Sequence, residues 1–89
     1  LMRALVVYCH PTPDSFTAAI RDTVVARLHA AGAEVRLHAL YADGFQPILS
    51  PHEWQGYLDC PQNCAPVDSQ VTDIRWCDTL IFVYPTWWY

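Results

Sequence analysis

Hydroxyl side chains gather in one short stretch near the amino terminus, in a setting that favours phosphate binding. Thr12, Ser15 and Thr17 lie in or just after a polar loop, residues 10–15, which joins an apolar run to a helical pattern. Free backbone N–H groups at the start of a helix attract anions, and the helix dipole supplies a positive field without any lysine. The stretch therefore predicts a phosphate cradle made of these hydroxyls and of the backbone around Ser15–Thr17.

The same loop also fits a simpler interpretation. Asp14 and Ser15 are both preferred N-cap residues, so the stretch can be an ordinary strand-to-helix turn, and the pattern alone leaves both interpretations open. Two other phosphate-binding loops are excluded. A Walker A loop requires a lysine, which the sequence lacks, and a dinucleotide fingerprint requires three closely spaced glycines, whereas the only glycines are Gly32, Gly44 and Gly56.

Apolar periodicity predicts three strands that would hold this loop in place. The run Ala4–Tyr8 is continuously apolar, as in a strand covered on both faces, and Thr79–Tyr84 is similar. In the strand Glu34–Leu40, Arg36 and His38 alternate with apolar residues. One face of that strand is expected to be wet or only lightly covered, which suits the edge of a sheet.

Three helices are expected between these strands. The first is predicted over Phe16–Ala31, where Gly32 would end it. A capping box with proline at the first helical position predicts a short helix over residues 50–57. An irregular loop, Asp59–Pro66, then leads to a weaker helix, Val67–Trp76. The side chains expected to face inward are Phe16, Ile20, Val24 and Leu28 in the first helix and Val67, Val71, Ile74 and Trp76 in the last.

This order of elements is typical of an α/β fold with a parallel sheet and helices on both faces. We expect a three-layer flavodoxin-like sheet that holds strands 2-1-3 of the full order 2-1-3-4-5. The third strand is as apolar as the first and should be interior, yet the 89 residues contain no further strand to cover it. The sheet is therefore predicted to be incomplete, with residues 1–89 forming the amino-terminal part of a single domain.

Aromatic rings dominate the last five residues, which are Pro85, Thr86, Trp87, Trp88 and Tyr89. In the order 2-1-3 they follow the strand beside the first one, so they flank the same crevice as the polar loop. Aromatic side chains there can wall in a flat ring, although they can equally be a cluster that a missing half buries. His10 lies at the mouth of the crevice and either contacts a ligand or only caps a turn. A phosphate loop and an aromatic loop around one crevice suit a flavin mononucleotide moiety, and hence a flavin-binding domain.

Composition narrows the class of protein. Five arginines and no lysine against nine acids give a formal charge of −4, which is not typical of a protein that binds nucleic acid without sequence preference. No apolar run approaches the ~20 residues of a membrane span. Because the sequence enters the first strand at once, we expect no signal peptide and expect Met2 to be the natural start. We therefore expect a cytoplasmic protein whose four cysteines are free thiols.

Other candidate residues favour structural roles. Cys60, Cys64 and His52 are spaced too loosely for a zinc site and no fourth ligand stands out, so no metal is predicted. Four aromatic residues are expected to pack in a core or an interface rather than to line a substrate pocket. They are Tyr41, Phe45, Trp54 and Tyr57.

Three linked motifs extend over essentially the whole chain. The first is H-x-x-x-x-S-F-N, the second D-L-Y-x-x-x-F-x-P and the third P-x-x-W. The first motif is matched by His10 and Ser15-Phe16-Thr17. The second is matched by Ala39-Leu40-Tyr41, Phe45 and Pro47, and the third by Pro85-Thr86-Trp87-Trp88. Threonine replaces the usual asparagine in the first motif, and alanine replaces the acid in the second. With these motifs the sequence resembles the NAD(P)H:quinone reductase family of flavodoxin-like flavoproteins.

The resemblance implies bound FAD or FMN, NAD(P)H as co-substrate, a quinone or similar acceptor and a homodimer. Hydride would pass from NAD(P)H through the flavin to the acceptor. The resemblance assigns no catalytic residue. The residues implied for the flavin phosphate or diphosphate are His10, Ser15, Phe16 and Thr17, and those implied for the isoalloxazine are Pro85, Thr86, Trp87, Trp88 and Tyr89.

The same resemblance limits what residues 1–89 do alone. The family's third flavin loop and much of its substrate pocket lie beyond Tyr89, so this stretch by itself is expected to be inactive. A flavodoxin-type electron carrier, or a regulatory flavoprotein subunit without turnover, is the alternative to the enzyme. A flavin-free fragment that keeps only a remnant of the fold is a third interpretation.

Overall fold

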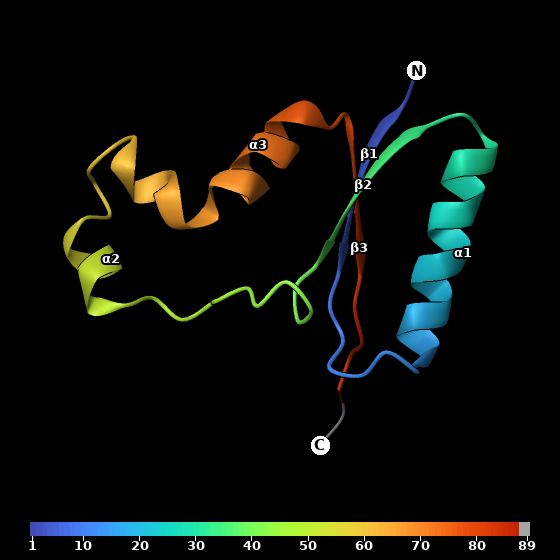
Figure 1. Cartoon of the computed structure of the whole chain (residues 1–89), viewed down its shortest axis with the longest axis horizontal. Helices are drawn as coiled ribbons and strands as arrows, with labels where there is room; N and C mark the ends of the chain where they lie inside the picture. Colours follow the sequence, from blue (N-terminus) through green and yellow to red (C-terminus); the bar gives the residue numbers. More distant parts are fainter. Residues whose placement is uncertain (88–89) are drawn as a thin grey trace.

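A three-stranded parallel sheet with helices on both faces forms the centre of the chain (Figure 1). The computed structural model describes residues 1–87. The strands pair in parallel in the order β2-β1-β3, which confirms the predicted flavodoxin-like arrangement. The elements in chain order are β1 (Arg3–Tyr8), α1 (Phe16–Ala30), β2 (Glu34–Ala39), α2 (Pro51–Gln55), the 3-10 helix η1 (Gln62–Val67), α3 (Asp68–Trp76) and β3 (Thr79–Val83).

The two faces of the sheet have different coverings. The core lies under α1, where Val6 and Tyr8 pack with Ala18 and Val83. Figure 1 shows the sheet edge-on, with α1 on one side and α3 and α2 on the other. Right-handed crossovers require this arrangement. The chain moves from β1 to β2 and then returns across β1 to β3, so the two connecting helices must lie on opposite faces.

The ends of α1 follow the predicted signals. The side chain of Ser15 caps the helix by accepting a hydrogen bond from the amide of Ala18. At the other end Gly32 has φ +80°, in the left-handed region that favours glycine after a helix. The carbonyl of His29 accepts a hydrogen bond from the Gly32 amide, which closes the last turn.

The stripe that α1 buries differs from the prediction. Phe16 is 82% exposed and Ile20 is 40% exposed, whereas Ala18 is buried against the sheet. The small side chain of Ala18 lets the first turn approach the strands closely, and this leaves the Phe16 side of the helix in solvent. Only the later part of the predicted stripe, Val24 and Leu28, packs against the core.

Gly32→Ala is expected to lower the free energy of unfolding of the full-length protein by about 1 kcal/mol. No atom lies within 4 Å of a Cβ placed at Gly32, so the cost comes from the positive φ and not from a clash. Gly56→Ala is the matched control, because Gly56 has φ −105° and its Cβ would make only ordinary contacts. Urea denaturation measures both variants, and equal losses of stability would contradict this account.

The polar face of β2 is covered only in part: Arg36 is exposed, as expected for a wet or lightly covered face, whereas His38 is buried. β2 lies at the sheet edge as predicted, but His38 is only 8% exposed. Asp73 of α3 bonds to Nε2 of His38 at 2.5 Å and accepts a hydrogen bond from Nη1 of Arg36 at 2.7 Å. The Arg36 guanidinium also stacks on the ring of Trp76 at 4.1 Å. A carboxylate from α3 thus satisfies both polar side chains of the strand, and the helix buries His38 while the Arg36 side chain stays 44% exposed.

Residues 46–67, called the arm below, project from the side of the sheet that carries α3 (Figure 1). The capping box of Ser50 and Glu53 forms as predicted and starts α2, which ends at Gln55, two residues early. The stretch predicted to be an irregular loop contains η1. No helix of residues 1–87 is both long and apolar enough to span a membrane.

Two further expectations concern α3 and the cysteines. α3 begins one residue later than predicted, and Ile74, expected to face inward, is 54% exposed. All four cysteines are free thiols, as predicted.

Candidate functional site

Two loops meet at the carboxyl ends of β1 and β3. Tyr8 pairs with Val83, and the Cys9 amide donates a hydrogen bond to the Val83 carbonyl at 3.0 Å, so the two chains leave the sheet side by side. Beyond them the rings of His10 and Trp87 lie 5.8 Å apart between centroids. The structure therefore brings the polar loop and the beginning of the aromatic loop together. Trp88 and Tyr89, which were also predicted to border the site, lie outside the described residues.

The start of α1 offers two free hydrogen-bond donors. The Ser15 hydroxyl accepts from the Ala18 amide at 3.0 Å and the Ser15 carbonyl accepts from the Ala19 amide at 3.1 Å. Within residues 1–87 the amides of Phe16 and Thr17 donate to no acceptor. The first turn of α1 holds no acidic residue, so no side chain of that turn neutralises the positive end of the helix dipole. This arrangement can bind an anion such as a phosphate.

His10 caps a turn, which is one of the two roles that were predicted for it. Its Nδ1 lies 3.0 Å from the Thr12 amide, which donates to it, and 3.2 Å from the Thr12 hydroxyl. Because these contacts use Nδ1 alone, Nε2 can still contact a ligand. The Thr12 hydroxyl is committed to the turn, and Thr17 is 8% exposed. The amides of Phe16 and Thr17 are therefore the donors of the predicted cradle that no acceptor within residues 1–87 engages.

Arg21 is a cation near this loop that sequence reasoning missed. Its guanidinium stacks over the ring of Tyr8 at 4.5 Å and pairs with Asp22 at 2.8 Å. The available signal was its spacing of four residues from Thr17, which places both on one side of α1. The buried Tyr8 hydroxyl below it has no hydrogen-bond partner within residues 1–87.

A hollow of about 440 Å³ lies beside the same edge of the sheet. Cys9, Tyr41, Phe45 and Pro47 are among the residues that line it. Tyr41 and Phe45, which belong to the second sequence motif and were expected to pack in a core or an interface, lie in the wall of this hollow. The other two aromatic residues of that set, Trp54 and Tyr57, lie in and after α2.

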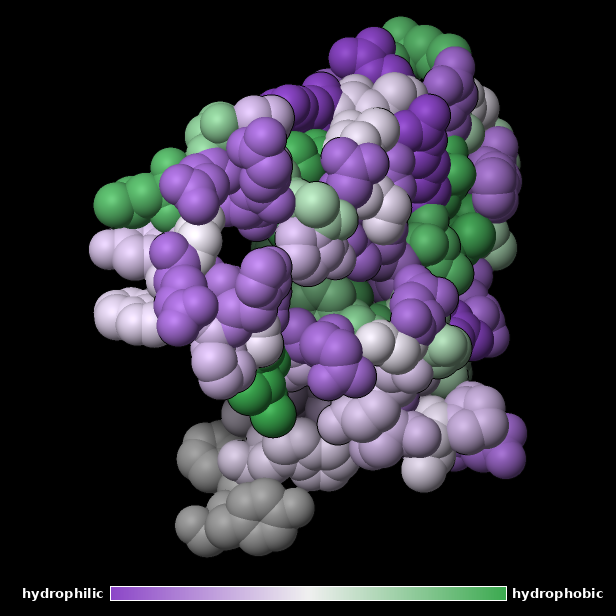
Figure 2. All heavy atoms as spheres, turned by 60° about the vertical axis from the view of Figure 1, so that its left-hand side comes forward, coloured by the Kyte–Doolittle hydropathy of each residue, from purple (hydrophilic) through white to green (hydrophobic). Residues whose placement is uncertain are grey.

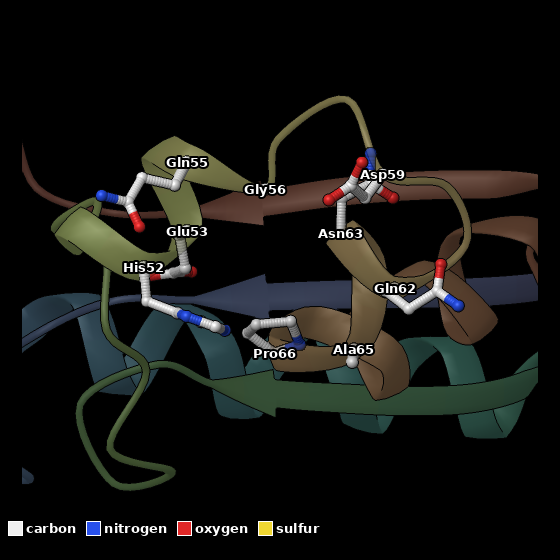
Figure 3. A pocket seen from close by; sticks show the side chains of 9 residues that line it. All are labelled: His52, Glu53, Gln55, Gly56, Asp59, Gln62, Asn63, Ala65 and Pro66. Carbon is white, nitrogen blue, oxygen red and sulfur yellow. The ribbon is translucent and has the colours of Figure 1, made fainter.

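A second hollow, of about 490 Å³, lies within the arm and is lined by polar side chains (Figure 3). Several of these groups are already engaged. Glu53 accepts a hydrogen bond from the Ser50 amide, which lowers the pKa of the Glu53 carboxyl, and Asn63 donates to the Tyr57 carbonyl at 2.7 Å. No cluster of three or more His, Cys, Asp or Glu side chains in residues 1–87 is placed to hold a metal ion.

Comparison with known proteins places the chain in a family. The sequence profile of the flavodoxin-like fold family matches residues 2–89. An uncharacterised NAD(P)H oxidoreductase of Escherichia coli, YcaK, is 31% identical over 88 residues, which cover 98% of this chain and 45% of that protein. NAD(P)H dehydrogenase (quinone) 1 of Cavia porcellus is 32% identical over 105 residues, covering 100% of this chain and 38% of that protein.

A solved structure shows the same relationship. An NAD(P)H:quinone oxidoreductase from Methanothermobacter marburgensis superposes with a TM-score of 0.83 at 26% identity, covering 98% of this chain and 46% of that one. The chain thus spans less than half the length of the relatives it matches. The resemblance inferred from the three motifs is confirmed by these names, and the strand order agrees with the matching profile. The chain belongs to the flavodoxin-like fold family.

Proposed function

We propose that this chain is the amino-terminal part of a flavin-dependent oxidoreductase that passes a hydride from NAD(P)H to a quinone or similar acceptor. The observation that carries the proposal is the meeting of two loops: the loop that contains His10 leads to the free amides of Phe16 and Thr17, and the ring of His10 lies 5.8 Å from that of Trp87. The relatives named as NAD(P)H oxidoreductase and quinone dehydrogenase support the same reaction class.

The residues of this chain bind and orient the cofactor in this proposal. A phosphate of FAD or FMN would be held by the Phe16 and Thr17 amides within the loop of His10 and Ser15, and the flat ring would be bordered by residues 85–89. The two free amides and the absence of acids in the first turn of α1 fit an anionic group there. When bound, the flavin would supply the hydride chemistry, and the protein supplies position and electrostatics.

The complete domain is proposed to continue beyond residue 89. β3 borders no further strand within residues 1–87, and Leu80 and Phe82 on it are 43% and 60% exposed. An apolar hollow of about 290 Å³ opens between the sheet and α3, with Leu5, Val7 and Phe82 among its walls. A right-handed crossover from β3 to a strand beside it would place the next helix on this face. The longer relatives have the length needed for these elements.

The full-length protein is further proposed to be a cytoplasmic homodimer. This follows the resemblance to the quinone reductase family.

Flavin content and turnover test the proposed function. The full-length protein is expected to retain flavin on purification, seen by absorbance, and to oxidise NADH or NADPH when a quinone is added. Tight flavin binding without turnover over a panel of quinones would instead indicate an electron carrier or a regulatory flavoprotein. Failure to bind either FMN or FAD would refute the site itself.

A further inference from the structure

We propose that Cys60 and Cys64 form a redox site, in which the two thiols close reversibly into a disulfide by exchange with a small disulfide such as oxidised glutathione. Both are free thiols in the arm, and three residues separate them. The arm projects away from the two loops that are proposed to bind flavin (Figure 1). The inference therefore goes beyond the proposed function and does not depend on it.

Backbone hydrogen bonds hold the two cysteines on one turn. Asp59 directly precedes Cys60, and its carbonyl accepts a hydrogen bond from the Asn63 amide at 2.7 Å. Pro61 directly follows Cys60, and its carbonyl accepts from the Cys64 amide at 3.0 Å. Figure 3 shows the side chains of Asp59 and Asn63 next to each other. Residues four apart on one helical turn have Cβ atoms about 5–6 Å apart. The turn therefore brings the two thiols within reach of each other.

The turn can adjust to the geometry of a disulfide. The Cβ atoms of a disulfide lie about 3.5–4.5 Å apart, so the two cysteines must approach each other by about 1–2 Å. Residues 57–63 are exposed and Cys64 is half-buried, so this movement disturbs no core packing. In Figure 2, which brings this side of the molecule forward, the arm stands off from the sheet and many of its side chains are hydrophilic.

The different exposure of the two thiols gives each one a role. Cys60 is exposed and Cys64 is half-buried, so the small disulfide meets Cys60 first. The Cys60 thiolate attacks one sulfur of that disulfide, forms a mixed disulfide and releases one small thiol. The Cys64 thiolate then attacks the Cys60 sulfur and releases the second small thiol. The two protein thiols thus lose two electrons and two protons, which reduce the small disulfide to two thiols.

The charges of this segment favour exchange with a disulfide over reaction with a peroxide. A cysteine that reacts quickly with peroxide lies beside a cation or a helix start that stabilises its thiolate. Residues 54–67 contain no lysine, arginine or histidine, and Asp59 is their only charged side chain. Their sequence supplies no activating cation to either thiol. The second thiol, rather than an activating charge, is therefore what makes oxidation of this site favourable.

Closing the bond would fix one wall of the hollow in the arm. Asp59, Gln62 and Asn63 lie on the same turn as the cysteines and line that hollow (Figure 3). The Asn63 side chain also donates to the Tyr57 carbonyl at 2.7 Å, which ties the turn to the segment after α2. A disulfide across the turn would stiffen this part of the arm and leave the sheet unchanged.

Glutathione exchange followed by mass spectrometry tests the proposal. The full-length protein is equilibrated at a fixed ratio of oxidised to reduced glutathione, its free thiols are alkylated, and it is cut with trypsin. Residues 37–75 contain no lysine, and their only arginine is Arg75 at the end, so they form one tryptic peptide. That peptide holds Cys60 and Cys64 and no other cysteine. It is expected to lose two hydrogens and to regain them with dithiothreitol.

A comparison with the unfolded protein tests the role of the turn. At the same glutathione ratio, the ratio of disulfide to dithiol is expected to be about 10-fold higher in the folded protein than in urea, because the turn raises the effective concentration of one thiol at the other. Equal ratios, or a folded protein that stays a dithiol, would overturn the proposal.

Two serine variants test the roles of the two thiols. Cys64→Ser removes the second thiol, so glutathione is expected to stay on Cys60. In Cys60→Ser the half-buried Cys64 is expected to take up glutathione about 10-fold more slowly than Cys60 does in the first variant. Cys9 and Cys77, which lie in other tryptic peptides, serve as internal controls. Glutathione that stays on the wild-type peptide as it does in Cys64→Ser would show that Cys64 does not reach Cys60, which would also overturn the proposal.

Discussion

Replacing Ser15 by aspartate is expected to weaken flavin binding to the full-length protein by about 100-fold while leaving the fold intact. Ser15 caps α1 through its hydroxyl, and aspartate is an equally good N-cap residue, so the helix start is preserved. The new carboxylate would lie beside the amides of Phe16 and Thr17, where the flavin phosphate is proposed to bind. Two like charges about 5 Å apart near a protein surface repel by roughly 3 kcal/mol, which corresponds to about 100-fold in affinity.

Ser15→Asn isolates the effect of charge, since asparagine has the shape of aspartate and is also a good N-cap. Titration of the flavin-free protein with FMN and with FAD, followed by fluorescence, compares the two variants. The asparagine variant is expected to bind within a few-fold of the wild type. Equal flavin affinities for the aspartate and asparagine variants would show that no phosphate lies at this loop.

The sheet was predictable because its determinants are local. The continuous apolar run of β1, the capping serine before α1 and Gly32 after it are each read from a few neighbouring residues, and all three are present in the structure. The order β2-β1-β3 agrees with the apolar patterns, which predicted β1 to be interior and the alternating β2 to lie at the sheet edge. The meeting of the two loops followed from the same order, since β1 and β3 are neighbours.

The errors arose where a residue's partner is distant in the sequence. Alternation in β2 showed that Arg36 and His38 share a face, but their partner Asp73 is 35 or more residues away on α3. The stripe of α1 was misplaced because apolar side chains were expected to be buried, whereas close approach to the sheet selected the small Ala18 and left Phe16 exposed.

Asp73→Asn is expected to lower the free energy of unfolding of the full-length protein by about 2 kcal/mol at neutral pH. Asp73 holds both His38 and Arg36, and its loss would leave the buried imidazole and the guanidinium without their anion. Breaking a fully buried pair costs about 3–5 kcal/mol, and the solvent exposure of the Arg36 side chain, 44%, reduces this. Chemical denaturation measures the change, and Asp68→Asn, at the exposed start of the same helix, is the matched control.

The pH dependence of that loss gives the sharper test. Burial opposes ionisation of Asp73, but hydrogen bonds from His38 and Arg36 outweigh it and lower the pKa of the carboxyl. A carboxyl whose pKa is lower in the folded than in the unfolded state adds stability that is complete above its ordinary pKa and disappears as the pH falls through the lowered one. The difference in unfolding free energy between wild type and Asp73→Asn is therefore expected to shrink in acid. A difference that stays constant from neutral pH to pH values below the lowered pKa would mean that the carboxylate does not fasten α3 to β2 as an ion.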